Sequence, residues 1–185
     1  MKNKMVKNRK HNGYAILAGI TLIIMTACGE EKKEEPKAAD SSKVTEIKKE
    51  ATAMVSFKEE ATEEVFQRYL ELKGALIKTD VAGAKIAASM MIKNLNENQL
   101  ELKSIAQELA DSDAIGKQRE LFATLTSKVE PLFKEQMTQG TIYKQFCPMA
   151  FNNTGGYWFS DVSEIRNPYY GDMMLTCGAV KETIQ

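Results

Sequence analysis

Two cysteines and two methionines near the carboxyl end of the chain are the side chains best suited to bind a ligand. Cys147 and Met149 are two residues apart, close enough to converge across a turn. Met174 and Cys177 are three residues apart, the spacing that puts two side chains on one face of a helical turn. Thiolates and thioethers are soft ligands, which prefer Cu(I) to hard cations. These four residues are therefore candidate ligands of a soft metal ion.

The two cysteines of this set also admit other interpretations. In an exported protein, Cys147 and Cys177 would be an even pair in a compartment that permits disulfides, so a disulfide between them is the second interpretation. Two buried free thiols without a role are the third. We expect no catalytic residues, because the pair is not a Cys-x-x-Cys motif and has no neighbouring His or Lys to lower a thiol pKa.

The distribution of charge and histidine narrows the possible functions. The 185 residues include 25 Lys and Arg, 25 Asp and Glu and one His. Residues 1–27 hold five of the cations, the only histidine (His11) and no acidic residue, which leaves 20 cations against 25 acidic residues in the remainder. That remainder lacks the imidazole that Ser-His-Asp catalysis, His-ligated haem and His-containing zinc sites need. Its acidic balance argues against nucleic acid as a partner.

The amino-terminal segment has the pattern of a secretory signal. A basic stretch precedes an apolar run from Tyr14 to Met25, which is too short to span a bilayer. The run ends in Met25-Thr26-Ala27-Cys28, which resembles the lipobox of bacterial lipoproteins. This resemblance implies a signal peptide over residues 1–27, cleavage before Cys28 and lipidation of Cys28, including acylation with fatty acids such as palmitate. Gly29 favours the outer membrane, with the protein facing the periplasm or the cell surface.

The residues after Cys28 divide into a tether and a folded domain. Residues 28–58 are rich in charge and poor in apolar side chains, so we expect a disordered tether. From Thr62 onward, apolar residues recur at intervals of three and four, which predicts helices over about 60–140. Asp80 is placed to cap the second helix and residues 111–113 the fourth, while Pro131 predicts a kink or a restart. Short connections favour an all-α fold, an antiparallel up-and-down bundle.

The last 45 residues differ in composition from this predicted bundle. Within this segment, Gly, Asn and Pro punctuate residues 146–170, which contain half of the chain's aromatic residues. We therefore expect residues 141–185 to form a loop-rich lobe held to the bundle by aromatic burial, with a short strand at 157–159. The aromatic residues between positions 146 and 170 are Phe146, Phe151, Tyr157, Trp158, Phe159, Tyr169 and Tyr170.

The motifs of this lobe and of the helical region resemble the DUF3347 family over nearly all of residues 60–184. That family is of unknown function and occurs as lipoproteins and as an extension of periplasmic adaptor subunits of copper- and silver-type efflux pumps. The resemblance implies a metal-related context, with Cys147, Met149, Met174 and Cys177 as ligands by position. Many relatives have His where this chain has Phe146. The motifs are Tyr69-Leu70-Glu71-Leu72-Lys73, Arg119-Glu120-Leu121-Phe122, Phe146-Cys147-Pro148-Met149, Gly155-Gly156-Tyr157-Trp158, Asn167-Pro168-Tyr169-Tyr170-Gly171 and Met174-Leu175-Thr176-Cys177-Gly178.

Together these features predict a non-enzymatic lipoprotein, anchored to the membrane through its lipid, that binds Cu(I) and serves metal buffering or efflux. A heavy-metal efflux adaptor is the expected partner. The alternative is a structural or protein-interaction lipoprotein module with a Cys147–Cys177 disulfide and no metal.

Overall fold

The computed structural model describes residues 54–185, so the predicted signal peptide, Cys28 and most of the predicted tether lie outside the described residues. The described part opens with the short strand β1, Ser56–Phe57. Val55 and Phe57 are buried in the core. The packed region therefore includes the last residues of the segment that the sequence assigned to the tether. Within residues 54–185, no helix has both the length and the apolar character needed to cross a membrane.

Four long helices follow β1 and confirm the helices expected from the apolar spacing. Each one buries the stripe of apolar side chains that the sequence showed; in the first helix Val65, Tyr69, Leu72 and Leu76 are all buried. The four helices are α1 (Glu60–Ile77), α2 (Val81–Asn94), α3 (Leu100–Asp111) and α4 (Ile115–Gln136).

Asp80 caps α2 as expected, because its carboxylate accepts a hydrogen bond from the Gly83 N–H at 2.9 Å. We expect Asp80→Ala to lower the free energy of unfolding by about 1 kcal/mol, because this donor then loses its partner. Urea denaturation measures the change. Glu108→Ala, at an exposed position of α3, is the control and should change stability by less than about 0.5 kcal/mol. Equal effects of the two substitutions would contradict the capping role.

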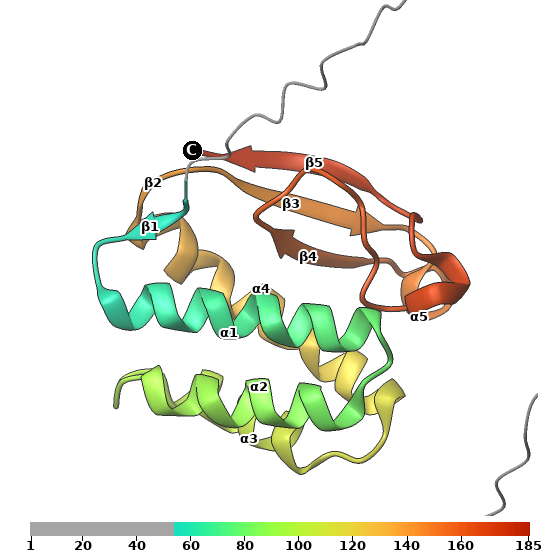
Figure 1. The fold of residues 1–185 in the computed structure, drawn as a ribbon, viewed down its shortest axis with the longest axis horizontal. Coiled ribbons are helices and arrows are strands. Elements are labelled where there is room, and N and C mark those ends of the chain that lie inside the picture. The colour runs from blue at the N-terminus through green and yellow to red at the C-terminus, as the bar shows by residue number, and fades with distance from the viewer. Residues whose placement is uncertain (1–53) are drawn as a thin grey trace, which may run out of the picture. The chain divides into compact units, whose positions relative to one another are not determined.

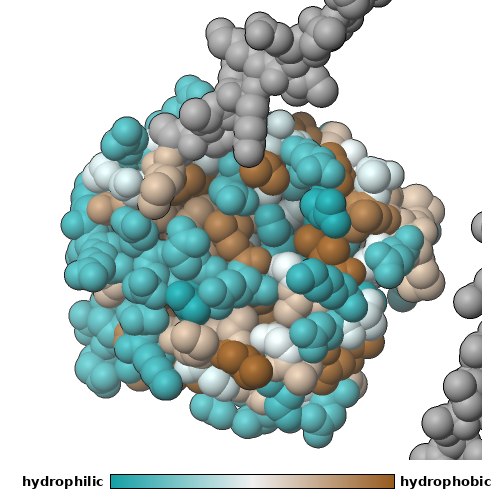
Figure 2. Space-filling view, viewed as in Figure 1, coloured by the Kyte–Doolittle hydropathy of each residue, from teal (hydrophilic) through white to brown (hydrophobic). Residues whose placement is uncertain are grey.

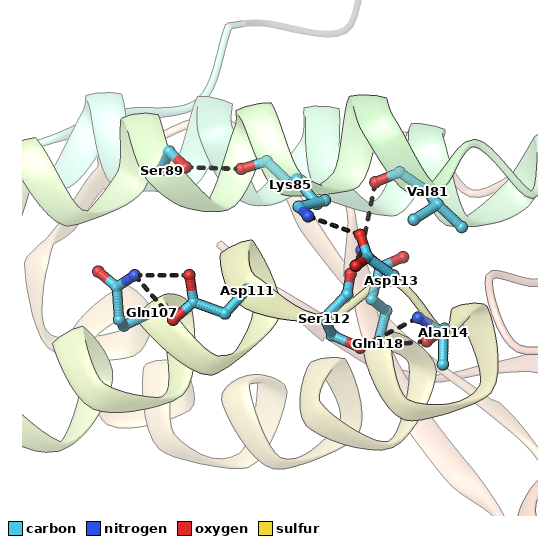
Figure 3. A network of polar contacts seen from close by, with 9 residues as sticks. All are labelled: Val81, Lys85, Ser89, Gln107, Asp111, Ser112, Asp113, Ala114 and Gln118. Carbon is cyan, nitrogen blue, oxygen red and sulfur yellow. Dashed lines mark hydrogen bonds and ion pairs between the residues drawn. The ribbon is translucent and has the colours of Figure 1, made fainter.

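The start of α4 differs from the prediction that residues 111–113 cap it. Its first flanking residue is Ala114, whose side chain forms no capping hydrogen bond. The connection is held instead by the buried Gln118, whose Nε2 donates to the carbonyl oxygens of Val81 at 3.2 Å and Ser112 at 3.0 Å (Figure 3). A side chain one turn inside α4 therefore ties the α3–α4 connection to the beginning of α2.

Pro131 lies inside α4, and of the two outcomes that the sequence predicts there, a kink or a restart, the restart does not occur. The helix runs from Ile115 through Pro131 to Gln136 as one element. Proline removes one backbone hydrogen bond and costs about 3 kcal/mol in a helix interior. Val129 and Phe133, on either side of Pro131, are completely buried. Their packing on the core offsets that cost.

The carboxyl-terminal third forms sheets, so the predicted all-α fold class is wrong and the fold is mixed α and β. Strand β2 (Met137–Gln139) pairs antiparallel with β1. Strands β3 (Ile142–Cys147), β4 (Gly156–Ser160) and β5 (Ala179–Ile184) form an antiparallel sheet in the order β4-β3-β5. Only the strand expected at 157–159 is confirmed, as part of β4. The short helices α5 (Ala150–Asn153) and η1 (Gly171–Met174, a 3-10 turn) lie between the strands.

The missed strands lack the alternation of apolar and polar residues that identifies a strand. β5 is exposed along nearly all of its length, so it carries no apolar face. Its pairing with β3 is interrupted by a register shift next to Gln145. The strands are held by pairing between distant segments, which local periodicity does not show.

Helices and sheet share one core. Figure 1 shows the three-stranded sheet on one side of α1 and α4, with α2 and α3 on the other side. Phe133 of α4 lies at the centre of an aromatic cluster, with ring centroids 5.1 Å from Phe66, 5.7 Å from Tyr69 and 5.8 Å from both Phe57 and Phe159. This cluster joins β1, α1, α4 and β4, and so confirms the expected aromatic attachment of residues 141–185.

Candidate functional site at Cys147 and Cys177

The fold brings the two cysteines of the described chain into contact. Cys147 is the last residue of β3, lies opposite Gly156 of β4 and is completely buried. Cys177 lies between η1 and β5 and is partly exposed. Because β3 and β5 are antiparallel and Phe146 pairs with Ala179, the segment leading into β5 runs beside the end of β3. The two Sγ atoms are 2.9 Å apart.

Both residues are free thiols in this structure. Their 2.9 Å contact is longer than the roughly 2.05 Å bond of a disulfide. The contact has the geometry of a hydrogen bond in which either thiol donates. The site is therefore a pair of thiols whose sulfur atoms are in contact. The fold does not keep the two cysteines apart.

The neighbouring thiol changes the acidity of Cys177. Its hydrogen bond with Cys147 raises the pKa of the Cys177 thiol, and burial raises it further, while the Met149 backbone N–H has the opposite effect. The proton shared between the sulfurs is therefore held more firmly than in an isolated cysteine. A metal ion or an oxidant has to displace it.

Asn167 fixes the segment that carries Cys177, a role that the sequence reasoning missed. Its side chain is completely buried, and its Nδ2 donates to the Cys177 carbonyl oxygen at 3.0 Å. Its backbone N–H donates to the Leu175 carbonyl at 2.7 Å, and its Oδ1 accepts from the Tyr169 N–H at 2.8 Å. The sequence offered only a turn signal, since an Asn before Pro168 usually marks a loop.

Gly178 lets the chain pass close to the sheet directly after Cys177. Its φ of +148° is one that L side chains rarely adopt. A Cβ atom at this position would lie 2.8 Å from the Trp158 ring and 3.0 Å from the Phe146 carbonyl oxygen. A glycine is therefore needed to place Cys177 against the end of β3.

The backbones of the two candidate methionines form hydrogen bonds with Cys177. Cys177 donates its N–H to the Met174 carbonyl at 3.1 Å. Met149 supplies the backbone N–H that favours the Cys177 thiolate, and its carbonyl accepts from the Tyr170 hydroxyl at 2.5 Å. The Met149 side chain is 46% exposed. The structure thus places all four predicted residues in one region, with the thiols at its centre.

Solvent reaches this region through a groove of about 290 Å³ beside Cys177. In Figure 2 brown apolar residues become more frequent toward the right side, where Figure 1 places α5. Among residues 54–185 no group of three or more His, Cys, Asp or Glu side chains is arranged to hold a metal ion. Any metal bound here would therefore depend on the two thiols and on thioethers. The groove is lined by Phe146, Pro148, Cys177, Gly178, Ala179 and Lys181.

A sequence model described as a protein of unknown function (DUF3347) matches residues 65–140. The match runs from the second turn of α1 to the end of β2 and stops before β3. It confirms the family resemblance over the helical region, while the four candidate ligands lie outside the matched residues. No curated protein and no solved structure matches the chain.

Proposed function

We propose that this chain, whose residues 65–140 belong to the DUF3347 family, is a non-enzymatic, lipid-anchored envelope protein that binds Cu(I). The observation that carries the proposal is the contact between the buried Cys147 thiol and the partly exposed Cys177 thiol. Cys147 and Cys177 would be the charged ligands, and Met149 and Met174 the neutral ones.

The chemistry of the pair suits a soft monovalent cation. Two thiolates would leave one negative charge after binding Cu(I), and no hard oxygen ligand is needed. Metal–thiolate bonds of about 2.3 Å, as in zinc sites, place two sulfur ligands roughly 3.5 to 4 Å apart. The sulfur atoms therefore have to separate from 2.9 Å. Cys177 is the one able to move, because it lies in the irregular segment between η1 and β5.

The membrane attachment belongs to the same proposal and depends on the sequence. The apolar run ending in Met25-Thr26-Ala27-Cys28 supports lipidation of Cys28, and more than one acyl chain is needed for stable anchoring. A lipoprotein of the outer membrane with a Cu(I) site would buffer the ion in the envelope or pass it to a heavy-metal efflux adaptor.

Titration of the reduced fragment 29–185 with Cu(I) against a chromogenic chelator tests the proposal. This fragment lacks Cys28 and contains all of the described residues 54–185. We expect the double variant Cys147→Ser plus Cys177→Ser to lose affinity by more than about 100-fold, which exceeds the loss caused by removing a residue that only hydrogen-bonds to a metal ligand. Met149→Leu and Met174→Leu should each weaken binding less.

Met173→Leu is the matched control, because Met173 is adjacent in the chain and 77% exposed. It should leave the affinity unchanged. Affinity that survives removal of both thiols would eliminate the proposed site.

The 2.9 Å contact also favours a second candidate, because it is shorter than the spacing of two sulfurs that share a metal. A permanent Cys147–Cys177 disulfide would make the chain a structural or protein-interaction module without metal. Protein isolated under non-reducing conditions would then resist alkylation at both cysteines, and the reduced protein would take up no Cu(I).

A further inference from the structure

We infer that Cys147 and Cys177 undergo thiol–disulfide exchange with a partner dithiol, and that the exchange takes place at Cys177. The biological role of this exchange rests on the proposed function: the oxidation state of the pair would decide whether Cu(I) binds. The partner chemistry is a dithiol protein of the thioredoxin type or, for oxidation, a disulfide such as glutathione disulfide.

The assignment to Cys177 follows from the unequal burial of the two sulfur-bearing residues. Cys147 has no exposed surface. Cys177 is partly exposed and lines the groove beside Phe146 and Lys181. An attacking thiolate needs a straight approach to the sulfur atom, so access decides which sulfur reacts. Only Cys177 offers that approach.

A partner dithiol reduces the Cys147–Cys177 disulfide in two steps. A partner thiolate attacks the Cys177 sulfur, the Cys147–Cys177 bond breaks, and its electron pair goes to Cys147, which takes up a proton. The second partner thiolate then attacks the partner sulfur of the mixed disulfide and releases Cys177 as a thiolate, which is protonated. The partner loses two electrons and two protons and becomes a disulfide, and the pair becomes a dithiol.

The fold allows both states without disturbing the strands. The sulfur atoms move from 2.9 Å to a bond of about 2.05 Å, a displacement of less than roughly 1 Å. Cys147 is fixed within the β3–β4 ladder opposite Gly156. The movement falls on residues 175–178, which belong to no strand or helix. Asn167, bonded to the backbone of this segment at Leu175 and Cys177, keeps it in register with β3.

The test uses the full chain in detergent micelles and a thioredoxin whose second active-site cysteine is replaced by serine, so that the mixed disulfide persists. After oxidation with glutathione disulfide and addition of this trap, peptide mapping locates the adduct. We expect the adduct at Cys177 to exceed that at Cys147 by more than about tenfold, in line with their access. An adduct mainly at Cys147, equal adducts, or no Cys147–Cys177 linkage at any glutathione ratio would overturn the inference.

Cys147→Ser and Cys177→Ser form the matched pair of controls. Treated with glutathione disulfide, the first should leave a Cys177 thiol that readily forms a mixed disulfide with glutathione and releases one glutathione, and the second a Cys147 thiol that is protected from this exchange. Brief alkylation of the folded, reduced wild-type chain supplies the same ranking without any substitution, so misfolding of a variant does not remove the test. Exchange without Cu(I) binding would refute the proposed function alone, and Cu(I) binding by a pair that never oxidises would refute this inference alone.

Discussion

Replacing Phe133 with alanine is expected to lower the free energy of unfolding by about 3 to 5 kcal/mol, the range for removing a large buried aromatic side chain. Phe133 has no exposed surface. Its ring contacts Phe66 and Tyr69 of α1 and Phe159 of β4. The cavity would therefore open where helices and sheet meet, and neither layer can collapse into it alone.

Two probes followed through the same urea titration measure this effect and show whether the two layers unfold together. Trp158, the only tryptophan in the chain, reports on the sheet by fluorescence, and far-ultraviolet circular dichroism reports on the helices. We expect coincident transitions at lower urea for Phe133→Ala. Ile86→Ala, at a 61% exposed position of α2, should stay within about 0.5 kcal/mol of wild type. Separate transitions would show that the sheet is an appended lobe.

The sequence predicts the helical layer well, because each helix buries a stripe whose spacing is local. Val65, Tyr69, Leu72 and Leu76 follow one another at three and four residues and are all buried. The cap at Asp80 is equally local, since donor and acceptor are three residues apart. Such patterns need no knowledge of distant segments.

The sheet was missed because its stability comes from residues that look like surface residues. Gln145 is completely buried in β3, and its Nε2 donates to the carbonyl oxygens of Val162, Ser163 and Glu164. A buried glutamine interrupts the apolar pattern that would have identified β3. Its partners lie 17 to 19 residues later in the chain, which no local rule connects to it.

The sequence predicts which residues form the candidate site, and it does not predict how they are arranged in space. Residue type and spacing selected Cys147, Met149, Met174 and Cys177, because each of these two cysteines has a methionine two or three residues away. The 2.9 Å contact depends on the β3–β5 register and on Gly178. The hydrogen bond from Asn167 to the Cys177 carbonyl could not be predicted either, since the sequence shows Asn167 only as part of a turn.

Lys73 is a buried cation whose environment makes stability depend on pH. Its Nζ donates to the Ser160 hydroxyl at 2.8 Å and lies 3.9 Å from the Asp161 carboxylate. Burial lowers the pKa of Lys73 from 10.5 to about 8, with Arg166 acting in the same direction and the attraction of Asp161 opposing it. The folded protein therefore binds fewer protons than the unfolded chain between pH 8 and 10.5.

Stability is consequently expected to rise with pH across this interval, because the unfolded chain holds the extra proton. The full difference between 10.5 and about 8 corresponds to about 3 kcal/mol. Burial raises the pKa values of Tyr69 and Tyr169, so their contribution to stability falls above pH 10. The raised pKa of Cys177 opposes the gain in the same way near and above its ordinary value of 9.0. The measurement is best made from pH 7 to 10.

Lys73→Met isolates this contribution, since it keeps the aliphatic stem and removes the charge. The difference in free energy of unfolding between wild type and variant should shift in favour of wild type by about 2 to 3 kcal/mol from pH 7 to 10. At pH 7 the variant should be as stable as wild type or more stable, because it no longer buries a charge. Lys78→Met, at an exposed position after α1, should follow the wild-type profile. A pH-independent difference between wild type and Lys73→Met would mean that Lys73 stays protonated throughout, and that the Ser160 and Asp161 contacts fully offset its burial.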